Sequence, residues 1–357
     1  MKMTLRWYGP GYDSVPIQHI RQIPGVSGVI TTLYGKQAGD LWMPAEIRAL
    51  KEAAGEAGLP VLGIESVNVS DDIKAALPKR DEHIDHYIRT LEALGQEGIG
   101  MVCYNFMPVF DWTRSDLAKI RPDGSSVLSY DQEIIDGIDP EGIFAAMEKR
   151  SGGFTLPGWE PERLRRISAL FAVYREIDEA KLFDNHRYFI RALLPTLRKY
   201  DIKMAVHPDD PAWPVFGLPR IMTGAENLQR ALRQADDPHN GVTLCTGSLG
   251  SDPANDIPAI IRQLGDRIHF AHVRNLAHHA PGKFDEAAHL SADGSMDMYA
   301  IMKALYDIGY RGAVRPDHGR MIWGETAMPG YGLYDRALGA AYLSGLWEAI
   351  GKSGGKQ

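Results

Sequence analysis

Four short apolar segments each end in a side chain that can bind a metal ion, and this pattern restricts the fold more than any other feature. The segments run from Ile202 to His207, Val242 to Cys245, Ile268 to His272 and Ala313 to Asp317. Each gap between them leaves room for one crossover helix, because a βα unit needs roughly 30 residues. Parallel strand ends meet on one rim of a TIM barrel, where such enzymes place their catalytic residues. The pattern therefore predicts that these four side chains converge.

Short apolar runs alternate with helical patterns along the whole chain. We predict eight strands, at residues 5–8, 28–33, 61–67, 99–106, 202–207, 242–246, 268–273 and 312–317. Strict alternation of strands and helices indicates a parallel sheet, and eight units predict a closed (β/α)8 TIM barrel. An open doubly wound sheet is the alternative. It is less favoured because no Gly-x-Gly-x-x-Gly sequence follows the first strand.

The length of 357 residues fits one TIM barrel with insertions. We expect a single domain over residues 1–357, with an insertion at about 109–184 after the fourth strand. This stretch is long and rich in Trp, Pro, Gly and charge. Such excursions serve as lids, caps or oligomer contacts, and a packing insertion without a catalytic part is the alternative. We also expect a homo-oligomer.

Charge and cysteine content exclude several classes of protein. The net charge is −7 and no basic run occurs, which argues against nucleic-acid binding. No apolar run reaches the roughly 18 residues of a membrane span, and the N-terminal residues lack the features of a signal peptide. The two cysteines lie in apolar segments and do not suggest a disulfide framework. We expect a cytoplasmic protein that binds neither nucleic acid nor membrane.

The four strand-end residues form a candidate metal site. Taken singly, His207 or His272 fits a buried histidine, Cys245 a small apolar residue, and Asp317 a helix cap. Their equivalent positions on four successive strands favour a shared divalent ion instead. The metal would ionise Cys245 and act as a Lewis acid toward a substrate oxygen. Ligand softness points first to zinc or iron and does not exclude manganese.

Other polar residues follow the remaining strands on the same predicted rim. Tyr8, Glu65 and Asn105 come at the ends of the first, third and fourth strands, and Arg274 and Asn275 follow the seventh. We expect all five to bind the substrate. Arg274 is placed to bind a carboxylate, with an ordinary surface ion pair as its alternative. We expect Asn105 and Asn275 to bind hydroxyls.

Two further residues are candidates for proton transfer. His318 follows a predicted ligand, so we interpret it as an acid/base group near the metal. Tyr331 lies between two glycines in a loop that could close over the rim. The alternative for Tyr331 is a buried tyrosine that supports the last helix.

Several long motifs resemble those of the mannonate dehydratase family, in the same order along the chain from about residue 3 to about residue 350. They are Arg6-Trp7-Tyr8-Gly9, Ala205-Val206-His207-Pro208-Asp209-Asp210-Pro211, Leu244-Cys245-Thr246-Gly247-Ser248, Phe270-Ala271-His272-Val273-Arg274-Asn275, Arg315-Pro316-Asp317-His318-Gly319-Arg320-Met321 and Pro329-Gly330-Tyr331-Gly332.

The resemblance implies a xylose-isomerase-like TIM barrel that dehydrates D-mannonate, a sugar acid, to 2-keto-3-deoxy-D-gluconate in hexuronate breakdown. It implies a divalent metal, Mn²⁺ or alternatively Fe²⁺. We give this implication more weight than the argument from ligand softness, which pointed to zinc. The family's ligands map onto His207, Cys245, His272 and Asp317. Its acid/base residues map onto His318 and Tyr331, with the division of roles left open.

Two other functions compete with this interpretation. The first is a metal-dependent sugar isomerase or epimerase on the same barrel, against which Cys245 and Arg274 argue. The second is a catalytically silent, metal-stabilised protein that binds sugar acids, against which His318 and Tyr331 argue.

Overall fold

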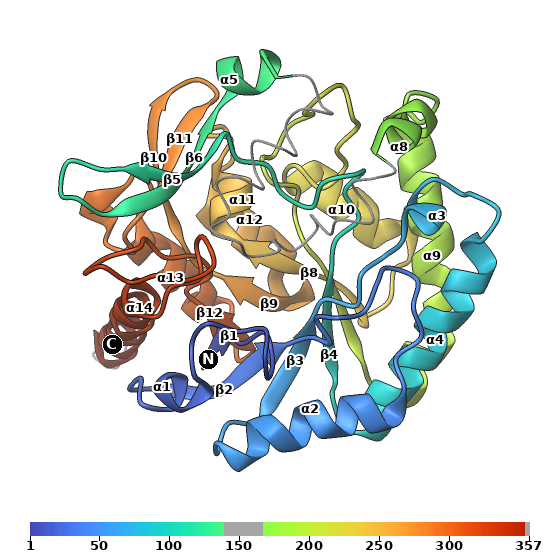
Figure 1. The fold of residues 1–357 in the computed structure, drawn as a ribbon, viewed down its shortest axis with the longest axis horizontal. Coiled ribbons are helices and arrows are strands. Elements are labelled where there is room, and N and C mark those ends of the chain that lie inside the picture. Colours follow the sequence, from blue (N-terminus) through green and yellow to red (C-terminus); the bar gives the residue numbers. More distant parts are fainter. Residues whose placement is uncertain (139–166, 354–357) are drawn as a thin grey trace.

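The computed structural model describes residues 1–138 and 167–353, and among these residues eight parallel strands close into a barrel (Figure 1). The ring order is β1-β12-β9-β8-β7-β4-β3-β2. The strands are β1 (Lys2–Arg6), β2 (Val26–Thr31), β3 (Val61–Glu65), β4 (Met101–Tyr104), β7 (Lys203–Val206), β8 (Asn240–Cys245), β9 (Ile268–His272) and β12 (Ala313–Arg315). The predicted TIM barrel is confirmed. The open-sheet alternative is wrong, because β1 pairs with β12 and closes the ring.

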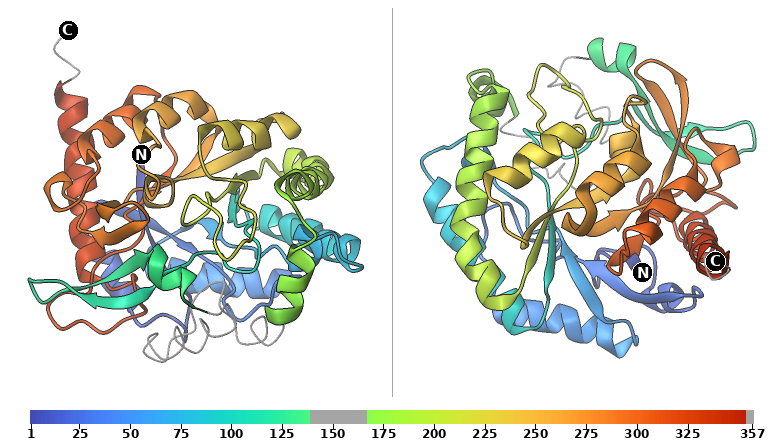
Figure 2. Two further views of the ribbon diagram at one scale, coloured as in Figure 1. Left: turned by 90° about the horizontal axis from the view of Figure 1, so that it is seen from above. Right: turned by 180° about the vertical axis from the view of Figure 1, so that it is seen from behind.

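Helices surround the barrel on the outside, as the views from above and behind show (Figure 2). They are α1 (Ile17–Arg21), α2 (Pro44–Glu56), α3 (Asp71–Lys74), α4 (Arg80–Gln96), α9 (Glu179–Tyr200), α10 (Ala225–Gln234), α11 (Thr246–Gly250), α12 (Ile257–Leu264), α13 (Met298–Asp307) and α14 (Tyr334–Ser353), with short 3-10 turns at Gly265–Arg267 and Ser291–Asp293. Within the described ranges, no helix combines the length and the apolar character that crossing a membrane requires.

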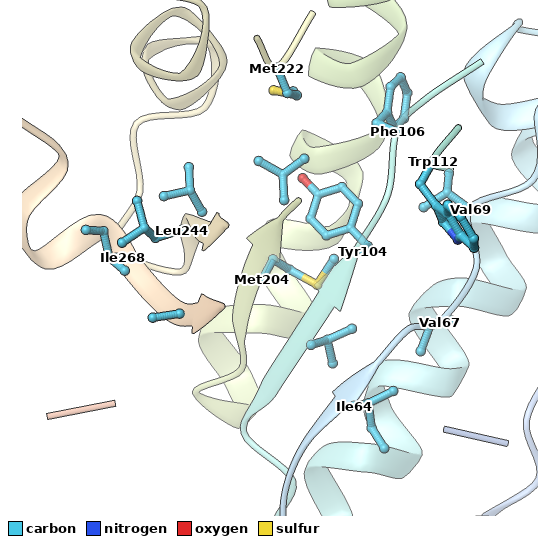
Figure 3. Packing of buried hydrophobic residues seen from close by; sticks show 14 of the residues in the cluster. Ile64, Val67, Val69, Tyr104, Phe106, Trp112, Met204, Met222, Leu244 and Ile268 are labelled. Carbon is cyan, nitrogen blue, oxygen red and sulfur yellow. The ribbon is translucent and has the colours of Figure 1, made fainter. Parts of the chain in front are cut away.

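The main apolar core lies between the barrel and its helices. Strand residues such as Ile64, Met204 and Leu244 contribute to it together with Phe106 and Trp112, which follow β4 (Figure 3). Because both faces of each barrel strand are covered, the strands consist of nearly continuous apolar residues. This explains why the strand positions could be predicted from the sequence.

A second, smaller cluster fills the inside of the barrel below its carboxyl-terminal rim. It consists of Ile30, Met101, Cys103, Ala205, Phe270 and Ala313. Side chains two residues apart on a strand point to the same face. The next inward positions after Cys103, Ala205, Phe270 and Ala313 are therefore Asn105, His207, His272 and Arg315. The barrel core thus aims these four polar residues at the space above it.

A second sheet lies beside the barrel mouth and was not predicted. It is antiparallel, with the order β10-β11-β6-β5, and joins two distant parts of the chain (Figure 1). Strands β5 (Asp116–Ile120) and β6 (Ser126–Asp131) belong to the expected insertion, whereas β10 (Asn275–Ala280) and β11 (Lys283–Ala287) follow β9. Helices α5 (Gln132–Asp136) and α8 (Ile167–Tyr174) also belong to the insertion. Residues 139–166 of the insertion lie outside the described residues.

We predict that Phe270→Ala destabilises the protein by about 3–5 kcal/mol, because removing a buried aromatic ring leaves a cavity. Phe270 is fully buried, and its ring packs edge-on against His272 with centroids 4.5 Å apart. The measurement is the urea midpoint of unfolding. Ile120→Ala, at an exposed position on β5, is the control and should leave the midpoint nearly unchanged. Equal shifts in both variants would contradict the packing role of Phe270.

Candidate active site

A polar cavity of about 470 Å³ opens at the carboxyl-terminal rim of the barrel. It is lined by many of the residues predicted from the sequence, namely Glu65, Asn105, His207, Arg274, Asp317, His318 and Tyr331. Cys245 and His272 are fully buried beneath these residues. The ring of Tyr8 packs edge-on against that of Tyr331, with centroids 5.2 Å apart.

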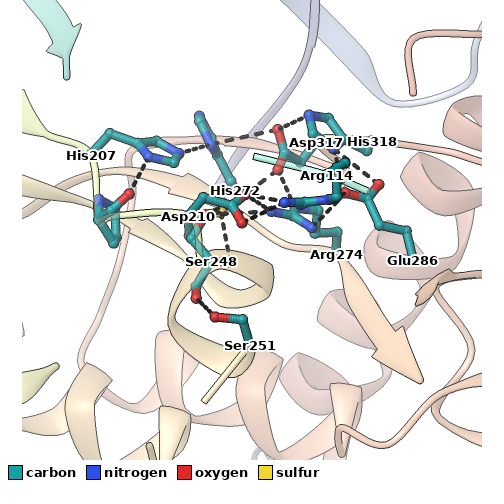
Figure 4. Close-up of polar contacts among 12 residues, drawn as sticks. Arg114, His207, Asp210, Ser248, Ser251, His272, Arg274, Glu286, Asp317 and His318 are labelled. Atoms are coloured by element: carbon teal, nitrogen blue, oxygen red, sulfur yellow. Dashed lines mark hydrogen bonds and ion pairs between the residues drawn. The ribbon is translucent and has the colours of Figure 1, made fainter. Parts of the chain in front are cut away.

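The four predicted metal ligands converge at the edge of this cavity. His207 Nε2 and His272 Nδ1 face each other at 3.2 Å (Figure 4). Asp317 Oδ1 lies 3.6 Å from His272 Nδ1, and its Oδ2 lies 3.7 Å from Cys245 Sγ. Ligand atoms of His207, Cys245 and His272 all lie within 4.8 Å of one another. Neighbouring ligands of one first-row ion are roughly 3–3.7 Å apart, given bond lengths of about 2.0–2.3 Å. The contacts of His272 with His207 and Asp317 fall in this range, and His207, Cys245 and His272 form a group that could hold one ion.

The surroundings of Cys245 favour its thiolate form, which metal binding requires. Burial raises the pKa of the thiol, but the Arg274 charge and the hydrogen bond with His207 outweigh it and lower the pKa to about 5. The Ser248 backbone N–H and hydroxyl both donate to Cys245 Sγ, at 3.4 and 3.0 Å. The first turn of α11 therefore stabilises the negative sulfur.

Glu65 supports His272 from the other side of the imidazole ring. Glu65 Oε2 lies 3.3 Å from His272 Nε2, so the second ring nitrogen can bear the proton while Nδ1 faces the other ligands. A carboxylate behind a ligating histidine is the usual arrangement that fixes tautomer and ring orientation. Burial raises the pKa of Glu65, but Arg315, His272 and Arg6 outweigh it, so Glu65 is ionised.

The backbone at Asp317 adopts a conformation that is uncommon for a residue with a side chain. Its φ is +64°, in the left-handed region. Asp tolerates this region better than most residues, and such strain concentrates at functional sites. The turn starts directly after β12 and directs the carboxylate back toward His272.

A buried network of arginines and carboxylates surrounds the ligands. Arg274 donates through Nε to Asp317 at 2.6 Å, through Nη1 to Glu286 at 2.9 Å and through Nη2 to Asp210 at 2.7 Å (Figure 4). Four arginines and four carboxylates take part, so their charges balance. They are Arg6, Arg114, Arg274 and Arg315, with Glu65, Asp210, Glu286 and Asp317. The Cys245 thiolate then adds one negative charge, so a divalent cation would leave the cluster ready for an anion.

The two predicted acid/base residues form a hydrogen-bonded pair. His318 Nε2 lies 3.1 Å from the Tyr331 hydroxyl. His318 Nδ1 lies 2.9 and 3.0 Å from the two oxygens of Glu286. Burial raises the pKa of Tyr331 above its ordinary value despite the nearby Arg315 charge, so its hydroxyl keeps its proton. Glu286 accepts a hydrogen bond from Nδ1, which leaves Nε2 directed at Tyr331 and the cavity.

Asn275 was predicted to bind substrate hydroxyls, but it does not line the cavity. It is fully buried, and its Nδ2 donates to the Leu290 carbonyl at 2.9 Å. Its Oδ1 accepts from the backbone N–H groups of Leu276 and Met296. The amide is thus used within the loop after β9, which argues against a role in binding hydroxyls.

Several residues of the site were missed by reasoning from the sequence. Arg6, Asp210 and Arg315 lie within the quoted motifs, and strand alternation from Ala313 would have placed Arg315 on the inner face. Glu286 and Arg114 gave no such signal. Glu286 lies on β11, and Arg114 lies in the segment before β5. The sheet that was not predicted brings Glu286 to His318 and Arg274, and it brings Arg114 to Glu286.

Comparison with known proteins gives a consistent result over the full chain. The family model for D-mannonate dehydratase (UxuA) matches residues 1–357. The chain is 65% identical over 354 residues to a mannonate dehydratase from Brachyspira hyodysenteriae, covering 99% of this chain and 100% of the relative. It is 52% identical over 354 residues to one from Thermotoga maritima, covering 99% and 98%.

Solved structures agree with the sequence matches. The crystal structure of mannonate dehydratase from Streptococcus suis serotype 2 superposes with a TM-score of 0.90 at 44% identity, covering 100% of this chain and 97% of that one. A D-tagatose 3-epimerase-like protein superposes with a TM-score of 0.57 at 13% identity, covering 99% of both chains. At that identity the second likeness shows only the shared barrel.

We predict that Cys245→Ser weakens metal binding, because a neutral hydroxyl replaces a thiolate poorly. Elemental analysis of the purified variant, with the unsubstituted protein alongside, measures this. The exposed-face variant Ile120→Ala serves as the control and should keep its metal. Full metal occupancy in the double variant Cys245→Ala, His272→Ala would show that these residues are not the ligands.

Proposed function

The chain belongs to the D-mannonate dehydratase (UxuA) family and is a hydro-lyase, and from this premise we propose how its residues perform the reaction. The enzyme dehydrates D-mannonate to 2-keto-3-deoxy-D-gluconate and water, a step of hexuronate breakdown. The observation that carries the proposal is the meeting, at one cavity, of the His318–Tyr331 pair and the four candidate ligands. His207 and Asp317 line the cavity, and Cys245 and His272 lie buried beside them. The family resemblance predicted from the sequence motifs is confirmed.

The reaction requires a base for the C2 proton and an acid for the departing C3 hydroxyl. Loss of the C2 proton shifts negative charge onto the carboxylate. Departure of the hydroxyl as water then gives an enol, which becomes the 2-keto product. The cavity therefore needs fixed positive charge near the carboxylate and a proton relay near C2 and C3.

We assign metal binding to His207, Cys245, His272 and Asp317, which supply two imidazoles, a thiolate and a carboxylate. The family is metal-dependent, and we propose Mn²⁺, or alternatively Fe²⁺, as the ion. When bound there, the ion supplies a Lewis acid for a substrate oxygen. Glu65 orients His272 and thereby supports this site.

We assign proton transfer to His318 and Tyr331. Glu286 contacts Nδ1 of His318 and so turns Nε2 toward Tyr331 and the cavity, a position that suits a base for the C2 proton. The Tyr331 hydroxyl retains its proton and is suited to protonate the departing hydroxyl. Asn105 lines the same cavity and is available to bind substrate hydroxyls, and Tyr8 supports the ring of Tyr331.

Neither competing function is favoured by the structure. The barrel likeness to sugar epimerases is a likeness of fold, which does not determine function. A silent binding protein would have no use for the buried Glu286–His318–Tyr331 arrangement. The homo-oligomeric state and cytoplasmic location expected from the sequence stay predictions.

The direct test is product identification from D-mannonate with metal-stripped enzyme, with and without added Mn²⁺. We expect 2-keto-3-deoxy-D-gluconate to form only when the metal is restored, because the ligand cluster is buried in the active site. Mass spectrometry and NMR identify the product. An epimer or isomer of the substrate as the sole product would overturn the dehydratase assignment.

We predict that His318→Asn and Tyr331→Phe each lower turnover by at least roughly 10²-fold, the lower end for loss of an acid/base group. Both variants should keep their metal, since neither residue is a proposed ligand. Exchange of the C2 proton in D₂O separates the roles. Tyr331→Phe should still exchange this proton, and His318→Asn should not.

The opposite exchange pattern would reverse the two roles. Normal dehydration by both variants would exclude the pair, and Glu65 would then be the next candidate for the base.

A further inference from the structure

Two arginines at the inner edge of the cavity have donor groups for which the described residues provide no partner. Arg315 donates through Nη2 alone, to Glu65 Oε1 at 2.8 Å and Asp317 Oδ1 at 2.7 Å. Its Nε and Nη1, and Nε of Arg6, are buried and have no hydrogen-bond partner within the described part of the chain. Leaving a buried charged donor unsatisfied is costly, so these groups point to a ligand with acceptor oxygens.

We infer that Arg6 and Arg315 bind the carboxylate of the substrate and select for sugar acids over neutral sugars. The inference rests on the proposed function and names the residues that recognise the acid group. Both arginines line the cavity, and they are only 5% and 2% exposed. Both guanidinium groups are therefore buried in the wall of the cavity and are not mobile surface side chains.

Arg274, the arginine predicted from the sequence for this task, is engaged by the protein's own carboxylates. All three of its nitrogens already contact the carboxylates of Asp317, Glu286 and Asp210. Arg114 is likewise committed to Asp210 and Glu286, and it does not line the cavity. A substrate carboxylate would compete with these buried pairs at Arg274 and Arg114. At Arg6 and Arg315 it would meet nitrogens that have no partner among the described residues.

The position of the two arginines also suits the chemistry. Arg315 contacts Asp317, one of the proposed ligands, and its charge acts on Tyr331 as well. Arg6 shares Glu65 with Arg315, at 3.3 Å, and stacks over the ring of Tyr8 at 4.7 Å. A carboxylate held here would lie beside Asp317, with C2 one bond away from it. Charge that develops on the carboxylate during proton removal then meets fixed guanidinium groups.

The test compares D-mannonate with D-mannonamide, in which a neutral amide replaces the carboxylate. The variants are Arg6→Gln and Arg315→Gln. We expect kcat/KM for D-mannonate to fall by roughly 10- to 100-fold in each, the range for lost hydrogen bonds to a charged group. The inhibition constant of D-mannonamide should change by less than about threefold. Arg315→Lys, which retains a charge, should recover part of the loss.

Arg114→Gln is the matched control, because it removes a buried arginine that does not line the cavity. It should affect acid and amide alike. Elemental analysis and circular dichroism verify metal content and folding. If Arg315→Gln does not fold, Arg6→Gln carries the test, because Arg6 contacts Glu65 and not Asp317.

Equal losses for acid and amide in Arg6→Gln and Arg315→Gln would overturn the inference, as would unchanged kcat/KM for D-mannonate in both. These results are distinguishable from failure of the proposed function. Product identification with the unsubstituted enzyme decides the dehydratase activity, whatever residues bind the carboxylate.

Discussion

The structure of the barrel mouth depends on one constraint, namely that buried charges must be paired. Taking an ion out of water costs several kcal/mol unless a partner of opposite charge and good geometry compensates. Arg274 is 1% exposed and meets this requirement through three carboxylates from different parts of the chain. Because these partners lie after β7, on β11 and after β12, their pairing fixes three loops relative to one another.

The same network divides the cavity into regions with different chemistry. The proposed metal ligands lie on one side, where Arg274 and Ser248 favour the thiolate of Cys245. The His318–Tyr331 pair lies on another, oriented by Glu286. Charged partners hold both groups rigidly, which suits catalysis because preorganised groups need not reorganise during the reaction.

The antiparallel sheet explains how a common barrel acquires a particular active site. Strands and helices of the barrel are shared with a D-tagatose 3-epimerase-like protein at 13% identity. The sheet adds Glu286 from β11, and the chain leading into β5 adds Arg114, which contacts that same carboxylate at 2.8 Å. Barrel enzymes vary function through the loops after their strands, and here two such loops pair to complete the site.

The sequence by itself determined the barrel and the candidate residues for metal binding and proton transfer. Apolar runs mark the strands because both strand faces are buried, and the period of two places His207 and His272 above Ala205 and Phe270. His318 and Tyr331 stand in motifs that can be read locally. Only the tertiary structure decided which polar groups meet. Arg274 pairs with three carboxylates, and the Asn275 amide bonds within its own loop. Arg6 and Arg315 keep donors that have no partner among the described residues. Glu286 and Arg114 are 172 residues apart in the sequence and form an ion pair in the structure. The pairing of β11 with β6 brings their two segments together. Local sequence patterns indicate which face of a segment is buried. The partner of a buried charge depends on how distant segments pack together, which a local pattern does not indicate.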